Sequence, residues 1–317
     1  MQPQRSLPCF RREEACIPAA LGFLSNAPGL AILEFEPRQT RGLRVNRHAT
    51  TEFLSGPASP AAFARPMPAL IAHRGAAHDA PENTLAAFRL AWQQGADGVE
   101  GDFHLTRDGE IVCIHDPVTL RTAGEPWKVA EATLADLRQL DVGSWKGERW
   151  RGTRIPTLRE VLATVPAGKR IFIEIKCGPA ILPALKHALA ESGLQPGQAV
   201  VICFDADVVR ATKRLLPALK ALWLTDFRAR NANGVKPTAD EILETLEQTG
   251  ADGVDCRAHA AVDQRFMQAL RAAHREVHVW TVDAVAMAER YRQLGADSLT
   301  SNRAGWLKRQ LLGEPTR

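Results

Sequence analysis

From residue 67 onward, short apolar runs rich in Val and Ile alternate with amphipathic stretches of helical length. Apolar runs of about four to eight residues predict strands, and apolar positions recurring every three or four residues predict helices. The predicted strands cover residues 69–73, 97–103, 111–115, 170–175, 198–204, 219–225, 252–256, 276–281 and 297–300. The predicted helices cover residues 84–94, 157–164, 180–191, 206–216, 238–248, 262–274, 284–294 and 303–311.

This alternation of strands and helices favours a parallel sheet. Residues 67–317 make up 251 residues, and an eight-stranded (β/α) barrel typically needs about 250. We therefore predict the α/β class and a TIM barrel, with a doubly wound open sheet as the alternative. The first helix is well marked, because Asn83 is a good N-cap and Gly95 stands just past the helix end.

Residues 1–66 differ from the rest of the chain in composition. They hold eight of the 20 prolines, neither Lys nor Asp, and one apolar stretch, residues 16–33, which Pro and Gly interrupt. This stretch is too broken to span a membrane, and two glutamates just before it argue against a secretory signal. We expect a poorly ordered extension, or a start codon assigned too early, because Met67 directly precedes the first predicted strand. The barrel domain is then residues 67–317.

The net charge of +4 resides mostly in residues 1–66, since residues 67–317 hold 32 basic and 31 acidic side chains. A nearly neutral domain lacks a broad basic face, so we expect no nucleic-acid partner. The six cysteines form no Cys-x-x-Cys pair, and four lie in or beside predicted strands. We therefore expect reduced thiols in a cytoplasmic protein, with no zinc site and no stable membrane insertion. The oligomeric state stays open.

Polar residues gather at the carboxyl ends of the predicted strands, where the active sites of TIM barrels lie. These residues are His73, Arg74, Glu100, Asp102, His104, His115, Asp116, Glu174 and Lys176. The aromatic residue Trp280 lies at the end of a later predicted strand. Residues two apart on a strand share a face, so Glu100 and Asp102 should point into the barrel together, as should Glu174 and Lys176.

Three of these carboxylates, Glu100, Asp102 and Glu174, would face a barrel interior that holds little solvent. Burying each without a cation would cost several kcal/mol. Oxygen ligands without Cys suit a hard divalent ion, so we predict Mg²⁺ or Ca²⁺ at this position rather than zinc.

Two histidines beside such a metal, an arginine and a lysine suit in-line displacement at phosphorus. The cations bind the phosphate, one imidazole removes a proton from the attacking oxygen, and the other protonates the leaving oxygen. A phosphodiester is the natural substrate, because its alkoxide leaving group needs an acid. Structural explanations stay open for single residues: a histidine at a strand end is more often structural. That interpretation holds best for His78, His104, His259, His274 and His278.

Six motifs occur in order between residues 69 and 308: IAHRGAAHDAPENTLAAF, GADGVEGDFHLTRDGEIVCIHDPVTLRTA, DVGSWKGERWRGTRIPTLREVL, IFIEIKCGP, VHVWTVD and GADSLTSNRAG. Together they resemble the glycerophosphodiester phosphodiesterase family. The resemblance implies a TIM barrel that hydrolyses glycerophosphodiesters, such as glycerophosphocholine, to sn-glycerol 3-phosphate and an alcohol.

The resemblance also implies the residues that act on the phosphate. His73 of the HRG motif and His115 of the HD motif would be the catalytic imidazoles, and Arg74 and Lys176 would bind the phosphate. In the mechanism proposed for the family, the glycerol 2-hydroxyl attacks phosphorus to give a cyclic phosphate that water then opens. Which histidine is the base in the first step is left open.

The remaining roles implied by the resemblance concern the metal and the rest of the substrate. Glu100 and Asp102 of the E-x-D motif and Glu174 of the E-I-K motif would hold the metal. Phe204 and Trp280 would contact the substrate.

The chain departs from the family pattern at a few positions. Gly101 replaces a bulky apolar residue, faces the helix layer and is expected to loosen packing. Cys203 stands where Ser is common, and Ser301 and Asn302 replace Thr and Asp. Cys203 and Asn302 are expected to line the side of the site that sets specificity.

Two other functions fit the same motifs. One is a lipid phosphodiesterase of the phospholipase C or sphingomyelinase D type, for which no secretion signal or apolar membrane-contacting loop is evident. The other is a barrel that binds a phosphorylated ligand without catalysis. The absence of His73 or His115 from the sequence would have favoured this alternative, and both are present. A metal-dependent amidohydrolase is excluded, because its first strand would carry His-x-His.

Overall fold

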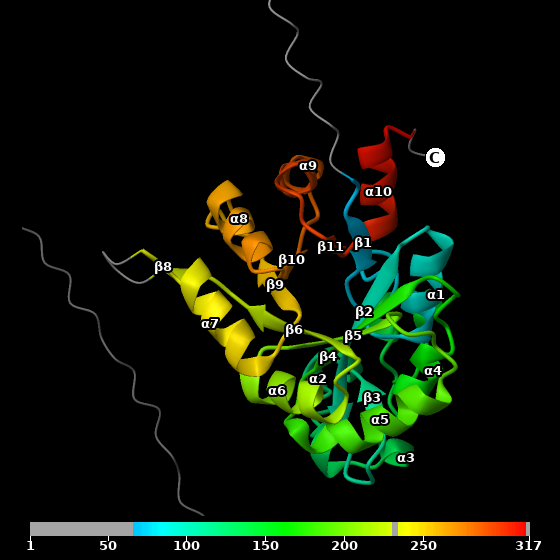
Figure 1. Cartoon of the computed structure of the whole chain (residues 1–317). Helices are drawn as coiled ribbons and strands as arrows, with labels where there is room; N and C mark the ends of the chain where they lie inside the picture. Colours follow the sequence, from blue (N-terminus) through cyan, green and yellow to red (C-terminus); the bar gives the residue numbers. More distant parts are fainter. Residues whose placement is uncertain (1–65, 230–233, 315–317) are drawn as a thin grey trace, which may run out of the picture. The chain divides into compact units, whose positions relative to one another are not determined.

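Eight parallel strands close into a barrel in the computed structural model, which describes residues 66–229 and 234–314 (Figure 1). In chain order the strands are β1 (Ala69–Ala72), β2 (Gly98–Leu105), β4 (Arg170–Ile175), β5 (Ala199–Cys203), β6 (Lys220–Thr225), β9 (Gly253–Arg257), β10 (Glu276–Trp280) and β11 (Ser298–Ser301). Strand β1 pairs with both β11 and β2, so the sheet has no free edge among these strands. The predicted TIM barrel is confirmed, and the doubly wound alternative is wrong.

The predicted strand at 111–115 is shorter than expected and lies outside the barrel. It is β3 (Ile111–Cys113), which pairs with β2 in the antiparallel direction. The turn between them is only a few residues long, whereas a parallel crossover needs a dozen or more residues. The chain therefore folds back as a hairpin, and β4 takes the next barrel position beside β2.

Helices follow the barrel strands and cover their outer face (Figure 1). They are α1 (Leu85–Gln93), α4 (Leu158–Leu162), α5 (Leu182–Glu191), α6 (Ala206–Leu215), α7 (Ala239–Thr249), α8 (Gln264–Ala272), α9 (Val285–Leu294) and α10 (Ala304–Leu312). Each overlaps a predicted helix, because each carries an apolar face at helical spacing.

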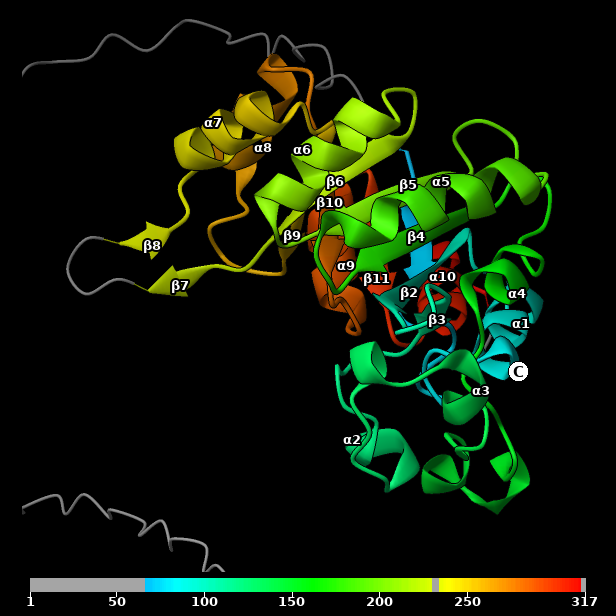
Figure 2. The same cartoon turned by 90° about the horizontal axis from the view of Figure 1, so that it is seen from below.

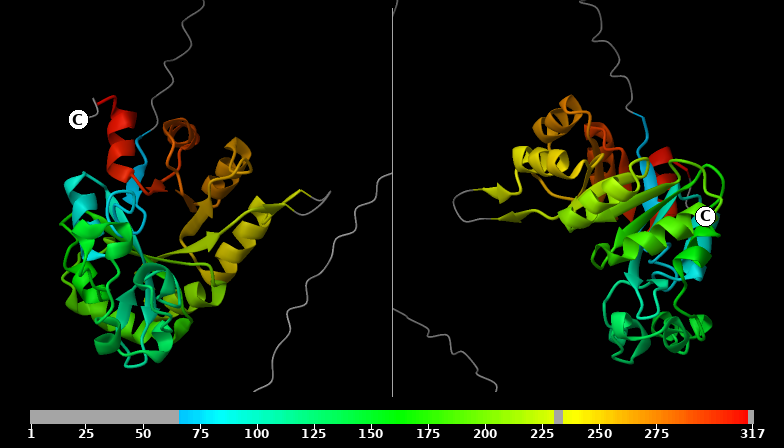
Figure 3. Two further views of the ribbon diagram at one scale, coloured as in Figure 1. Left: turned by 180° about the vertical axis from the view of Figure 1, so that it is seen from behind. Right: turned by 60° about the horizontal axis from the view of Figure 1, so that its bottom comes forward.

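Short helices between β3 and α4 were not predicted. They are α2 (Leu120–Ala123), η1 (Val129–Glu131), α3 (Leu134–Leu137), η2 (Ser144–Lys146) and η3 (Glu148–Trp150). Figure 2 shows α2 and α3 on one side of the barrel, away from α6 and α7. A small hairpin of β7 (Arg228–Ala229) and β8 (Val235–Lys236) extends away from the barrel after β6 (Figure 3).

The cap of α1 differs from the prediction by one residue. Thr84, not Asn83, is the N-cap, and its side chain accepts a hydrogen bond from the amide of Ala87. Asn83 instead lies in the left-handed region at φ +58°, which Asn tolerates better than most residues, and its side chain is used at the candidate site. Gly95 follows the helix at φ +85°, as predicted.

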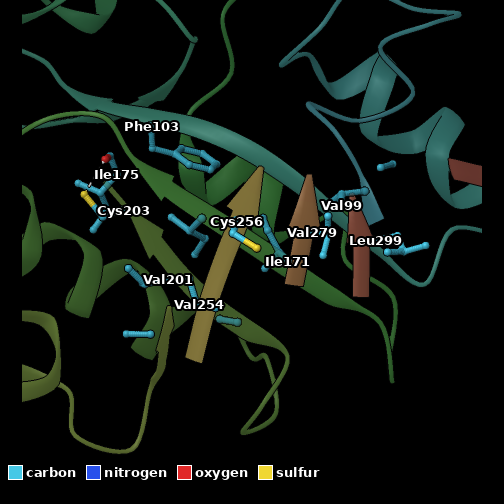
Figure 4. Packing of buried hydrophobic residues seen from close by; sticks show 14 of the residues in the cluster. Val99, Phe103, Ile171, Ile175, Val201, Cys203, Val254, Cys256, Val279 and Leu299 are labelled. Carbon is cyan, nitrogen blue, oxygen red and sulfur yellow. Dashed lines mark hydrogen bonds between the residues drawn. The ribbon is translucent and has the colours of Figure 1, made fainter. Parts of the chain in front are cut away.

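Side chains of the barrel strands divide into an outer and an inner core. The outward-facing residues pack against the helices, and Figure 4 labels ten of them, from Val99 to Leu299, along the barrel strands. The inner core is smaller and consists of Ile71, Phe172, Val200, Ile202, Leu222 and Leu224. Ile71, Phe172, Val200 and Leu222 fill the lower barrel, whereas Ile202 and Leu224 lie among polar residues nearer the carboxyl ends of the strands.

The predicted extension, residues 1–66, falls almost entirely outside the described residues. Within the described residues, Cys113, Cys177, Cys203 and Cys256 are unpaired thiols. No helix in residues 66–229 or 234–314 has both the length and the apolar character to cross a bilayer.

Candidate active site

Stacked layers of side chains fill the barrel, with four residues in each layer from alternate strands. The strand registers place Ile71, Phe172, Leu222 and His278 in the lowest of three successive layers. Above them lie Glu100, Ile202, Asp255 and Thr300, followed by His73, Glu174, Leu224 and Trp280. The upper two layers, with Arg74, His115, Lys176 and Phe204, line a cavity of about 170 Å³ at the carboxyl ends of the strands.

A larger hollow of about 590 Å³ lies at the opposite end of the barrel, where Arg170, Lys220 and Glu276 begin their strands. It is lined by none of the predicted site residues. The smaller cavity is therefore the candidate active site, because eight of the nine predicted site residues line it and the ninth, Asp102, lies next to two of them, Glu100 and Glu174.

Three carboxylates meet at this cavity as predicted. Glu100, Asp102 and Glu174 each offer an oxygen, and these oxygens lie within 4.8 Å of one another. Burial and the neighbouring Asp102 raise the pKa of Glu100 well above its ordinary value, and the same two causes raise that of Glu174 to about 7. Oε1 of Glu100 and Oδ1 of Asp102 are buried without a hydrogen-bond partner. A hard divalent cation fits this donor set, because it would satisfy the buried oxygens and relieve their repulsion.

Arg74 and Lys176 hold positive charge beside the carboxylates. The backbone amide of Arg74 donates to Oε2 of Glu100 at 2.9 Å, and its Nε lies 3.3 Å from Oδ2 of Asp102. Nζ of Lys176 lies 2.8 Å from Oε1 of Glu174 and 3.5 Å from Oδ1 of Asp102. Burial opposes ionisation of Asp102, but Arg74 and Lys176 outweigh it and lower its pKa.

Asn83 fixes the position of Asp102 from the opposite side. Its Nδ2 donates to Oδ2 of Asp102 at 2.7 Å, while its Oδ1 accepts from the backbone amide of Asp102 at 3.1 Å. Sequence analysis missed this role and placed Asn83 at the helix cap. The only indication of it in the sequence was that Asn83 belongs to the first family motif, IAHRGAAHDAPENTLAAF.

His73 is held by a chain of two further residues. Its Nδ1 lies 2.8 Å from Oδ1 of Asn302, and Nδ2 of Asn302 donates to Oδ2 of Asp283 at 2.7 Å. Burial and then Arg74 lower the pKa of His73. Asn302 therefore contacts the site through His73, but it does not line the cavity as expected. Asp283 was missed, although it ends the VHVWTVD motif.

His115 has a different kind of partner. Its Nδ1 lies 2.7 Å from Oδ1 of Asp116, and Arg121 donates through Nε to Oδ2 of Asp116 at 2.6 Å. Arg121 also contacts Glu82 at 2.7 Å, and Glu82 accepts from Arg74 at 2.9 Å. Charged side chains thus connect the two histidine motifs, and sequence analysis gave no role to Glu82 or Arg121.

Phe204 and Trp280 form the aromatic wall of the cavity. Their ring centroids are 5.8 Å apart in an edge-to-face arrangement, and both line the cavity. Cys203 does not line it: its side chain packs in the outer core, and its Sγ contacts the carbonyl oxygen of Ile175. The expectation for Cys203 is wrong because residues next to each other on a strand point to opposite faces.

Gly101 faces the helix layer as expected, but packing there is tight. A Cβ at Gly101 would lie 3.0 Å from Cζ of Phe88 and 3.2 Å from Sγ of Cys113. These two side chains fill the space that a larger residue would need, so the expected loosening is wrong.

The histidines interpreted as structural do not line the cavity. His104 contacts the carbonyl oxygen of His115 at 3.1 Å, and His259 stacks on Phe227. His278 lies in the layer below the cavity and bonds to Ser298. His78 and His274 also lie outside it.

Comparisons with known proteins point to one family of enzymes. Residues 73–305 match the model of the glycerophosphoryl diester phosphodiesterase family. A glycerophosphodiester phosphodiesterase of Caldanaerobacter subterraneus is 38% identical over 157 residues, which cover 48% of this chain and 64% of that protein. One of Bacillus subtilis is 28% identical over 249 residues, which cover 73% of this chain and 82% of that protein.

A solved structure is similar over most of the barrel. It is an Oleispira antarctica phosphodiesterase in complex with the product sn-glycerol-3-phosphate. The TM-score is 0.69 at 27% identity, and the match covers 78% of this chain and 98% of that one.

Proposed function

Because this chain belongs to the glycerophosphoryl diester phosphodiesterase family, we propose that it hydrolyses glycerophosphodiesters to sn-glycerol 3-phosphate and an alcohol. The observation that carries the proposal is the shared cavity, lined by His73, His115, Arg74 and Lys176 beside the carboxylate cluster. Two imidazoles and two cations around one small cavity suit a phosphodiester better than a neutral substrate.

Glu100, Asp102 and Glu174 would hold a divalent cation, Mg²⁺ or Ca²⁺. When bound, it would supply positive charge that stabilises the phosphate and orients the glycerol hydroxyls. Arg74 and Lys176 would bind phosphate oxygens from the other side. Because guanidinium groups can bind two oxygens at once, Arg74 would also fix the orientation of the phosphate.

The partners of the two histidines support a different role for each in the first step. The Asn302 amide oxygen can only accept, so Nδ1 of His73 carries the hydrogen and Nε2 keeps a lone pair. His73 is therefore the proposed base. His115 is the proposed acid, because the carboxylate of Asp116 beside its Nδ1 balances the charge of a ring that carries two protons.

The proposed reaction has two steps. The glycerol 2-hydroxyl oxygen attacks phosphorus as its proton moves to His73, and the bond from phosphorus to the alcohol oxygen breaks as His115 protonates that oxygen. The product is a cyclic phosphate. Water then attacks phosphorus and opens the ring. His115 removes a proton from this water, and His73 returns a proton to the 2-oxygen.

We also propose that the protein works in a reducing compartment, the cytoplasm. Four unpaired cysteines among the described residues support this, since secreted proteins usually pair theirs.

A panel of glycerophosphodiesters tests the function. Purified protein is assayed with choline, ethanolamine, inositol and glycerol diesters, each in EDTA, Mg²⁺ or Ca²⁺, and sn-glycerol 3-phosphate is quantified. We expect release of this product from several diesters, and only with a divalent cation. No product from any diester in either metal would refute the proposed function, and full activity in EDTA would refute the requirement for a divalent cation.

A further inference from the structure

Asp255, a buried carboxylate to which the proposed mechanism gives no role, lines the same cavity. It lies in the middle of β9, is 1% exposed, and its Oδ1 is buried without a hydrogen-bond partner. A buried carboxylate oxygen without a partner is costly. Its place in the cavity wall indicates that a ligand supplies the missing donor.

Two neighbouring donors on β10, His278 and Trp280, bond to other groups. Nδ1 of His278 lies 2.6 Å from Oγ of Ser298, and its Nε2 lies 3.1 Å from Glu276. Nε1 of Trp280 donates to the backbone oxygen of Asp255 at 3.1 Å, not to its carboxylate. Burial accordingly raises the pKa of Asp255 to about 6, while His278 opposes the rise.

The strand registers place Asp255 opposite the carboxylate cluster. It shares a layer with Glu100, and their strands, β9 and β2, stand diagonally across the barrel. The deep end of the cavity is therefore bounded by Glu100 on one side and Asp255 on the other. The aromatic ring of Phe204, which is 47% exposed, lies nearer the mouth.

We propose that Asp255 is a specificity-determining residue that accepts a hydrogen bond from the terminal hydroxyl of the glyceryl group. This inference rests on the function proposed above. The glyceryl group is the part of the substrate held at Glu100, so it occupies the deep end, and the variable alcohol points to the mouth. A hydroxyl fits Asp255 because a carboxyl group can accept from it in either protonation state.

The test compares two substrates that differ only in the terminal hydroxyl: glycerophosphocholine and 2-hydroxypropyl phosphocholine. Both keep the attacking 2-hydroxyl and the choline. Each is assayed in saturating metal with wild-type protein, Asp255→Leu and Asp255→Asn. The control Ile202→Val shortens an apolar side chain of the same layer, which also lines the cavity, and changes no polar group.

The wild-type protein should prefer the glyceryl substrate by about 10- to 100-fold in kcat/KM, as for loss of a hydrogen bond to a charged group. Asp255→Leu should abolish the preference, Asp255→Asn should keep part of it, and Ile202→Val should leave it unchanged. Equal losses on both substrates in Asp255→Leu would overturn the proposal and give Asp255 a structural role.

A third substrate separates the glyceryl group from the alcohol. Methyl glycerol phosphate has no cationic alcohol, and Asp255→Leu should lose as much activity on it as on glycerophosphocholine. A loss confined to the choline substrate would overturn the proposal in favour of an ammonium site.

Binding separates this proposal from the proposed function. If the wild-type protein hydrolyses no diester, the function is wrong. Calorimetry with sn-glycerol 3-phosphate and 2-hydroxypropyl phosphate still tests Asp255: tighter binding of the former must depend on the carboxylate, and equal binding by wild-type protein would overturn the inference.

Discussion

Asn302 turns its amide oxygen toward His73, with Oδ1 2.8 Å from Nδ1, and its amide nitrogen toward Asp283. The contact with the Asp283 carboxylate fixes the amide orientation, because only the nitrogen can donate. His73 therefore has a neutral partner. A carboxylate at position 302, which the family pattern would supply, would favour the protonated ring instead.

This pairing makes a pH prediction. A base must be unprotonated, and burial and Arg74 lower the pKa of His73. Wild-type kcat/KM should therefore stay constant down to pH values below the ordinary pKa of a histidine. In Asn302→Asp with Asp283→Asn, a carboxylate faces His73 without a second carboxylate beside it. The acidic limb of kcat/KM should move up by about one pH unit or more. Asp283→Asn alone is the control, and an unmoved limb in the double variant would refute His73 as base.

The two histidines should respond differently to the leaving group. His73→Ala and His115→Ala should each lower kcat on glycerophosphocholine by about 10²–10⁴-fold. A p-nitrophenyl diester of glycerol phosphate hardly needs an acid, so its first turnover should be nearly normal in His115→Ala and slow in His73→Ala. Stopped-flow release of p-nitrophenol measures this, and rescue of His73→Ala instead would reverse the assignment.

Gly101 should not tolerate the bulky residue that the family pattern has. Gly101→Val should lower stability by about 1–3 kcal/mol, because Phe88 and Cys113 already contact the position. Phe88→Leu should offset part of this loss, so the double variant should be more stable than the sum of the single changes predicts. Urea unfolding of the four proteins measures the coupling, and additivity would show that Phe88 does not set the limit.

Residues 1–66 should be dispensable for catalysis. Their composition motivates this prediction, and the barrel strands begin only at Ala69. A protein that begins at Met67 should keep the melting temperature and kcat of the full chain. Insolubility or a much lower melting temperature in scanning calorimetry would show that the segment packs on the barrel.

Local patterns predicted much of the fold and site. The alternation of side chains along a strand placed Glu100, Asp102, Glu174 and Lys176 correctly, because that rule needs no knowledge of the neighbouring strands. The same rule, applied to Cys203, would have excluded it from the cavity.

Features that depend on several distant segments were not predictable. Asn302 meets His73 only because β11 pairs with β1, and Asp283 joins them from the segment that follows β10. The short helices between β3 and α4 span about one turn each, which is too little for a periodic pattern to emerge.

Ionisation of Glu174 should lower the stability of the folded protein unless a cation is bound. Its pKa in the folded protein, about 7, lies above the ordinary value near 4.5. Below about pH 4 both the folded and unfolded states hold the proton, and stability is unaffected. As pH rises from there through 7, the unfolded state ionises more readily, so metal-free protein loses stability across this window. Glu174→Gln removes that loss and should melt at higher temperature than wild-type protein at pH 8 in EDTA. In saturating metal the order should reverse, because ligand binding stabilises only the protein that binds it well.

Glu276→Gln is the matched control. Glu276 lies at the far end of the barrel, where its contacts with His278 and Lys220 lower its pKa to about 2. This variant should therefore melt at a lower temperature than wild-type protein with or without metal. If Glu174→Gln melts below wild-type protein in EDTA and binds metal equally well by calorimetry, Glu174 is not a metal ligand.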